Sequence, residues 1–202
     1  MWVLLASLVL LEQVEDFDPA RLLDGKLPGL SPLASNGGVA GLELHITATG
    51  IVQEVVVIDD APPFTEEMRK VIRLWRFDPA RRNGERVASK IAVVGVFRAP
   101  TLMGGDPPTP TRIGAPSREI PYPIETATPA YPPKALHAGL VMMEVEIDAG
   151  GAIANVEMLN DGGGFSAAAL EAVRKFRFSS APGYVLVVFG FPQPLTLRKT
   201  PR

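Results

Sequence analysis

One stretch of this sequence recurs later in the chain, at a constant offset of 101 residues. Gly50 recurs as Gly151, and the segment 73–77 recurs as 174–178 with two arginines, an aromatic residue and a phenylalanine at matching places. Chance matches scatter over many offsets, so a fixed offset indicates a duplicated structural unit. Each unit is roughly 65 residues long and would be marginally stable alone, because a domain of about that length buries only about 60% of the surface that its unfolded chain exposes. Packing the two copies together would relieve that shortfall.

Composition narrows the classes of function. The formal net charge is −2 and the pI is about 5.8, whereas nucleic-acid binders usually carry a clear basic excess, so no nucleic-acid partner is expected. The chain has no cysteine, which excludes disulfides and thiolate chemistry. Its two histidines, His45 and His137, are too few for a zinc site without cysteine. We therefore expect no metal and no cofactor.

The chain divides into four segments. Residues 1–27 hold an apolar stretch at 1–11 and an acidic lead-in, residues 28–98 form repeat one, residues 99–128 a proline-rich linker, and residues 129–202 repeat two. The apolar stretch has the length of a signal-peptide core and is too short for a bilayer, which needs about 20 residues. Its alternative role is a segment packed on the domain. An export signal would place the protein in the periplasm or cell envelope.

Both repeats predict the same order of elements. Apolar and polar residues alternate at 42–46 and at 143–147, which indicates a strand with one buried face. A glycine turn then leads into a second strand, so the two form a hairpin. Apolar residues at helical spacing follow the hairpin, which predicts a helix. Each copy then ends in a strand, at 90–97 and at 184–191. The expected fold class is α+β, with each repeat a three-stranded antiparallel sheet that has helices packed on one face.

This ordered set of residues resembles the carboxy-terminal domain of TonB, in tandem copies. In repeat two the likeness runs from Pro129 to about Phe191. Repeat one is similar from about Gly38 to Phe97, but more divergent, and its strongest stretch is 74–80. The marks in repeat two are Tyr131-Pro132, Ala135, Gly139, the strand 141–147, Asp148, Gly150-Gly151, the helix 167–175 and Phe176-Arg177-Phe178.

The resemblance implies a non-enzymatic bacterial protein of the periplasm that binds an outer-membrane receptor or another envelope protein, with a link to TonB-type transport across the outer membrane. In energy-transducing members, a receptor strand adds to the edge of the sheet. An open three-stranded sheet offers such an edge because the backbone groups of its last strand are unpaired. The candidate partner-binding residues therefore lie on the two last strands: Ile91, Val93, Gly95, Phe97, Val185, Val187, Phe189 and Phe191.

Two other hypotheses stay open. The repeats could pair with each other edge to edge and bury these strands, which would make the chain a structural scaffold or pseudo-dimer; copies could also self-associate through the same edges. An enzyme is the third hypothesis, because Asp60 and Asp161 recur at the exit of the second strand. Turn-forming preference explains them equally well, and no nucleophile–base pair is visible, so no catalytic residue is expected.

Overall fold

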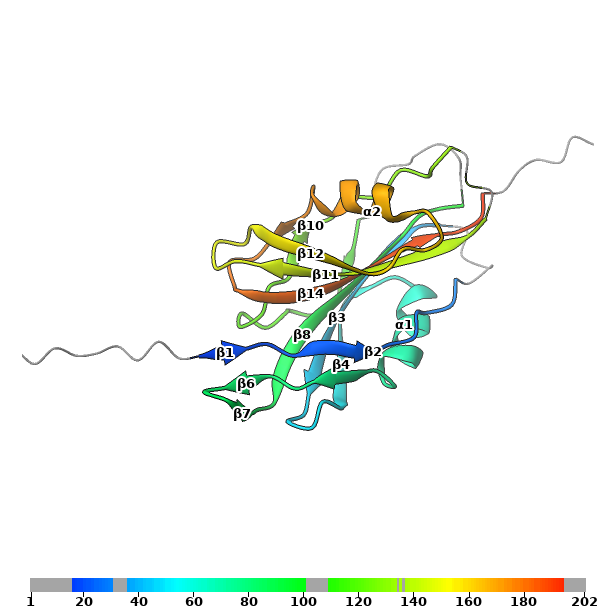
Figure 1. Cartoon of the computed structure of the whole chain (residues 1–202). Coiled ribbons are helices and arrows are strands. Elements are labelled where there is room, and N and C mark those ends of the chain that lie inside the picture. Colours follow the sequence, from blue (N-terminus) through cyan, green and yellow to red (C-terminus); the bar gives the residue numbers. More distant parts are fainter. Residues whose placement is uncertain (1–15, 31–35, 101–108, 134, 136, 195–202) are drawn as a thin grey trace, which may run out of the picture.

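The computed structural model describes residues 16–30, 36–100, 109–133, 135 and 137–194, and it shows a mainly β protein (Figure 1). The apolar stretch 1–11 lies outside the described residues. The first half contains β1 (Phe17–Asp18), β2 (Arg21–Asp24), β3 (Gly38–Ile46), β4 (Val52–Asp60), α1 (Phe64–Ile72), β5 (Arg76–Asp78), β6 (Arg81–Arg82), β7 (Glu85–Arg86) and β8 (Ser89–Phe97). The second half contains β9 (Thr111–Arg112), β10 (Pro123–Glu125), β11 (Gly139–Ile147), β12 (Ile153–Asn160), α2 (Ser166–Val173), β13 (Arg177–Phe178) and β14 (Gly183–Phe191).

The two predicted hairpins are confirmed as β3–β4 and β11–β12. Gly50 and Gly151 turn the chain in them with positive φ angles of 80° and 84°. Their N–H groups donate to the carbonyls of Thr47 and Asp148 at 2.9 and 3.0 Å. A Cβ atom at Gly50 would also lie 1.9 Å from the carbonyl oxygen of Phe77. Glycine is therefore required at this recurring position.

The long strands of both repeats join a single mixed sheet of seven strands, in the order β12-β11-β14-β8-β3-β4-β9. β14 and β8 run parallel, from the pair Val185 and Ala92 to the pair Gly190 and Phe97. The predicted fold class, two separate three-stranded sheets each with helices on one face, is therefore wrong. The last strand of each repeat pairs with the last strand of the other instead of ending as an open edge.

The composition of the two last strands gives the physical reason. Residues 91–97 and 185–191 hold only apolar side chains and glycine, with no polar residue on either face. A strand with one solvated face alternates polar and apolar residues, whereas an unbroken apolar run suits a strand whose two faces are both covered. β8 and β14 meet this requirement because one core cluster covers Val94 and Val187 on one face, and the other covers Val93 and Leu186 on the opposite face.

The two helices of the described chain cover opposite faces of the sheet (Figure 1). α1 packs in one core cluster together with Leu186 and Val188 from β14 of the other repeat. α2 packs in the second cluster together with Val94 and Val96 from β8. A two-fold axis along the strands would produce this arrangement, because it keeps the paired strands parallel and exchanges the faces. The helix residues in the two clusters are Phe64, Met68 and Ile72 of α1, and Ala169, Ala172 and Val173 of α2.

Repeat one carries a short hairpin that repeat two lacks. β6 and β7 pair around Asn83 and Gly84, which have positive φ angles of 51° and 83°. β1 adds to β6, so the lead-in, β6 and β7 form a small three-stranded sheet. In repeat two, only residues 179–182 separate β13 from β14. The two copies therefore differ most at the entry to their last strands.

We expect the two repeats to unfold as one cooperative unit, because the sheet and both core clusters cross between them. In a Trp2→Phe background, Trp75 in the core of repeat one is the sole tryptophan. Phe189→Ala removes a fully buried ring from repeat two and should cost about 3–5 kcal/mol of unfolding free energy. It should therefore lower the urea midpoint reported by Trp75 fluorescence.

The matched control is Ile124→Ala, which truncates a side chain that is 66% exposed and should leave that midpoint unchanged. A Trp75 transition that stays in place in the Phe189→Ala variant would contradict a shared cooperative unit.

Candidate partner-binding site

The eight residues predicted for partner binding lie in the middle of the sheet. β8 has β3 on one side and β14 on the other, and β14 lies between β8 and β11. Ile91 is 3% exposed and Gly95 is buried, while Val93, Phe97, Val185, Val187, Phe189 and Phe191 have no exposed surface. Partner binding at these strands stays a prediction. In this arrangement it would require the two repeats to separate.

The open edges of the sheet lie at β12 and β4. Within the described part of the chain, β12 has a neighbouring strand only on its β11 side. On β4, the short strand β9 covers Asp59 and Asp60, and the Ile113 and Gly114 amides donate to the Ile58 carbonyl at 2.9 and 3.1 Å. β12 is therefore the longer edge at which backbone groups have no strand beside them.

β12 lacks two of the residue types with which natural proteins protect an edge, although its register with β11 shifts at Ala154 and at Leu159. Residues 153–160 include no lysine and no proline, and Glu157 is their single charge. Lysine and proline are common on protected edges because they oppose the addition of another strand. The Glu157 carboxylate is itself paired with the Arg21 guanidinium at 2.9 Å. The outer side of β12 can therefore accept an extended chain.

The lead-in to each repeat crosses onto the other repeat. Arg21 on β2 forms an ion pair with Glu144 on β11, and its guanidinium lies 4.3 Å from the centre of the Tyr184 ring. In the opposite direction, the Ser117 N–H donates to the Glu43 carboxylate on β3 at 2.7 Å. Glu43 and Glu144 are equivalent positions of the repeat. The lead-in segment of each repeat therefore contacts a buried glutamate of the other repeat, and these contacts hold the two repeats together.

The two equivalent glutamates have different electrostatic surroundings. Burial by itself would raise the pKa of Glu43, but hydrogen bonds from the Ser117 amide and His45, with the nearby charge of Lys90, hold this pKa below its usual value of 4.5. His45 Nε2 and Lys90 Nζ lie 2.9 and 3.5 Å from the Glu43 carboxylate. At Glu144 burial outweighs the attraction of its ion-pair partner, and the pKa is raised above 4.5.

Sequence reasoning missed both glutamates. The alternation in repeat one places Glu43 and His45 on the polar face of their strand, yet Glu43 is only 5% exposed and Glu144 only 3%. The reason is that the lead-in to the other repeat covers this face. The one available signal was the recurrence of glutamate at the same place in both copies.

Asp59 anchors the segment that connects the repeats. Its carboxylate accepts a hydrogen bond from the Tyr122 hydroxyl at 2.7 Å and pairs with the Arg112 guanidinium. Burial and the bond to Asp59 raise the pKa of Tyr122, so its phenol stays protonated. These contacts give the buried aspartate a structural role, in which it ties the residues that follow 109 to the end of β4.

The other residues considered for chemistry do not come together in one site. Over the residues that the structure describes, no three histidine, aspartate or glutamate side chains gather as a metal site would require. The His137 ring packs edge-on against Phe165, with ring centres 5.1 Å apart. Nor does any helix of the described ranges have the length and apolarity needed to cross a membrane.

We expect Glu43→Gln and Glu144→Gln to show opposite pH dependences. A lowered folded-state pKa means that charged Glu43 stabilises the fold above about 4.5, and this stability is lost as pH falls through the folded pKa. A raised pKa means that protonated Glu144 stabilises the fold below about 4.5, and this benefit is lost as pH rises through the folded pKa. With rising pH, Glu43→Gln should become more destabilising and Glu144→Gln less so.

Urea unfolding of both variants across this pH range measures the two slopes. Parallel slopes would contradict the assignment of different environments to the two glutamates.

A comparison with protein families gives one match. Residues 31–98 match the family of the Gram-negative bacterial TonB protein C-terminal. The matched stretch contains β3, β4, α1 and β8, so it is repeat one, although the resemblance was expected to be closer in repeat two. A second copy of the family in repeat two stays a prediction. A search of curated proteins finds no match to the chain. The similarity to the TonB C-terminal family therefore covers residues 31–98, which is less than half of the chain.

Proposed function

We propose that this chain is a non-enzymatic protein of the Gram-negative cell envelope that binds a protein partner by adding a strand of that partner to its sheet. The family match of residues 31–98 is the observation that carries this proposal. Residues 1–11 would act as the export signal. The partner is an outer-membrane receptor or another envelope protein, and a receptor would link the chain to TonB-type transport.

The outer side of β12 is the first candidate for strand addition. It is the longer open edge of the described sheet, and its side chains include no lysine or proline. Strand addition draws its affinity from main-chain hydrogen bonds, which β12 can supply from Asn155 to Met158, where its register is regular. The residues around Val93 and Val187 are the second candidate, which requires the parallel pair β8–β14 to open.

A second function is favoured by the pairing of β8 with β14. This pairing makes the two repeats a self-contained pseudo-dimer, so the chain could serve as a structural scaffold without strand exchange. The two functions differ in whether the folded chain retains a partner from the envelope.

We expect the full chain to capture a protein from envelope extract and a proline on β12 to release it. Where the register is regular, adjacent strand residues point their N–H groups to opposite sides, so one of Val156→Pro and Glu157→Pro removes a donor from the outer edge alone. That variant should keep the wild-type circular dichroism and thermal midpoint and lose most of the captured protein. Failure of the wild-type chain to capture any envelope protein would leave the scaffold function.

We expect capture to survive a covalent lock between the repeats. Val94 and Val187 are paired on β8 and β14 and share a core cluster. The chain has no other cysteine, so Val94→Cys with Val187→Cys offers a single disulfide, and neighbouring strands bring Cα atoms within the usual disulfide range of about 4.4–6.8 Å. Equal capture by the oxidised and reduced forms places binding outside β8 and β14. Capture by the reduced form alone would move the site to those strands.

A further inference from the structure

A cavity of about 540 Å³ lies at the place where β12 begins. Three segments line it: the turn of the β11–β12 hairpin with the first residues of β12, the residues that follow α2, and Ile124 of β10. The volume falls within the usual range of ligand sites, about 300–1,000 Å³. The cavity therefore adjoins one end of the strand at which partner binding is proposed.

The chain itself covers the equivalent place in repeat one. There Ile51, at the turn before β4, forms an isolated bridge with Arg76 of β5. The equivalent residues of repeat two are Ala152 and Arg177, and no bridge joins them in the described ranges. Alanine also offers a single methyl group where repeat one has the larger side chain of isoleucine. The two repeats therefore differ at this place, and repeat two leaves room for another chain.

The cavity has an apolar surface beside β12. Ile124 is 66% exposed, and Ile153, the first residue of β12, is half-buried. Both side chains line the cavity, together with the segment that holds Phe176 and Phe178. An apolar side chain in the cavity would remove apolar surface of the two isoleucines from water, which is favourable.

One cation at this cavity has no counter-charge. Arg177 pairs with Glu125 at 3.2 Å, and Lys175 pairs with Glu171 at the same distance. Arg174 is exposed and lines the cavity, and its guanidinium has no partner among the residues that the structure describes. Because the neighbouring cations are already paired, the cavity matches a single carboxylate.

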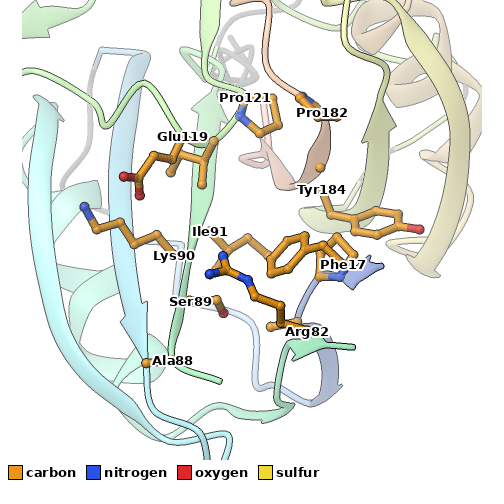
Figure 2. Close-up of a pocket in the computed structure, with 14 residues that line it drawn as sticks. Phe17, Arg82, Ala88, Ser89, Lys90, Ile91, Glu119, Pro121, Pro182 and Tyr184 are labelled. Atoms are coloured by element: carbon orange, nitrogen blue, oxygen red, sulfur yellow. The ribbon is translucent and has the colours of Figure 1, made fainter. Parts of the chain in front are cut away.

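The cavity at the start of β8 and β14, of about 460 Å³, differs in this respect (Figure 2). Its cations already have partners within the chain. The Arg82 guanidinium lies 5.7 Å from the centre of the Phe17 ring, and Lys90 Nζ lies 3.5 Å from the Glu43 carboxylate. Charge complementarity therefore favours the cavity beside β12 as the place that attracts a carboxylate from a partner.

A strand added to β12 would lead into this cavity. β12 keeps a regular register with β11 from Asn155 to Met158, and the register shifts at Ala154. Ile153 and Ala152 follow, roughly 7–10 Å from Asn155 at about 3.3 Å per residue of strand. A partner chain that pairs along residues 155–158 therefore needs only a few further residues to fill the cavity.

We infer that the partner segment that adds to β12 carries an apolar residue close to an aspartate or glutamate, and that the cavity binds both side chains. The main chain of the segment pairs with residues 155–158, its apolar side chain covers Ile124 and Ile153, and its carboxylate pairs with Arg174. The inference rests on the proposed function and deepens it, because it names the chemistry by which the partner is selected.

A phage-displayed library of random peptides, panned on the full chain, tests this inference. The peptides are fused through their carboxyl ends, so they offer side-chain carboxylates alone. Enriched peptides should share an aspartate or glutamate close to an apolar residue. Their affinity, measured by fluorescence anisotropy, should fall about tenfold in Arg174→Gln and in Ile124→Ala. Ala152→Trp fills the cavity from an exposed position and should abolish binding.

Repeat one supplies a matched control for two of these variants. Arg73 ends α1 as Arg174 ends α2, and Leu23 of β2, which is 70% exposed, is the equivalent of Ile124. Arg73→Gln and Leu23→Ala should therefore bind the peptides like the wild type. Added salt should weaken binding to the wild type more than to Arg174→Gln, because salt screens the charge pair. Thermal midpoints show that each variant is folded.

The β12 proline variant that removes an outer donor separates this inference from the proposed function. It should lose the peptides together with the captured envelope protein. The inference is overturned if no peptide is enriched, or if the three cavity variants bind the peptides as tightly as the wild type. Envelope protein that is still captured by the three cavity variants and lost in the proline variant keeps the proposed function and overturns the inference.

Discussion

The parallel pairing of β8 with β14 is the contact on which the rest of this structure depends. It merges two hairpins into one sheet, directs α1 and α2 to opposite faces, and gives each core cluster residues from both repeats. The two strands pack closely at this contact, because a Cβ atom at Gly190 would lie 2.4 Å from the Phe97 ring. The same contact removes the last strands from the edge of the sheet. Within the described chain, the sheet edges without a neighbouring strand are therefore β12 and the part of β4 that β9 does not cover.

The lead-in segments reinforce this contact with charge. Buried carboxylates are costly unless they are paired or hydrogen-bonded, and each repeat supplies that compensation to the other, through Arg21 for Glu144 and through the Ser117 amide for Glu43. The compensation is stronger at Glu43, where His45 and Lys90 add to it. Two positions that recur at the 101-residue offset therefore have opposite pKa shifts. Within one chain the two positions can differ in this way, whereas identical subunits of a symmetric dimer would give both the same surroundings.

The features that sequence reasoning predicted correctly are local. Alternation and a turn glycine identify the hairpins β3–β4 and β11–β12, since both signals act over a few residues. The pairing of the last strands is not local, and its signal was the absence of alternation in 91–97 and 185–191, which a family likeness with an open edge obscured. The burial of Glu43 and Glu144 depends on how the two repeats pack together, and a pattern within one repeat does not contain that information.

The distance in sequence between β8 and β14 has a consequence for folding. Repeat one is complete at β8, yet β14, which pairs with β8, is made only after β11, β12 and α2. Until it arrives, an entirely apolar strand lies at the border of a half-built sheet, where other chains could add to it and aggregate. Long-range strand pairing is also slow to form. Carrying the second copy on the same polypeptide gives the correct strand a high effective concentration, and so lets it compete with strands from other molecules.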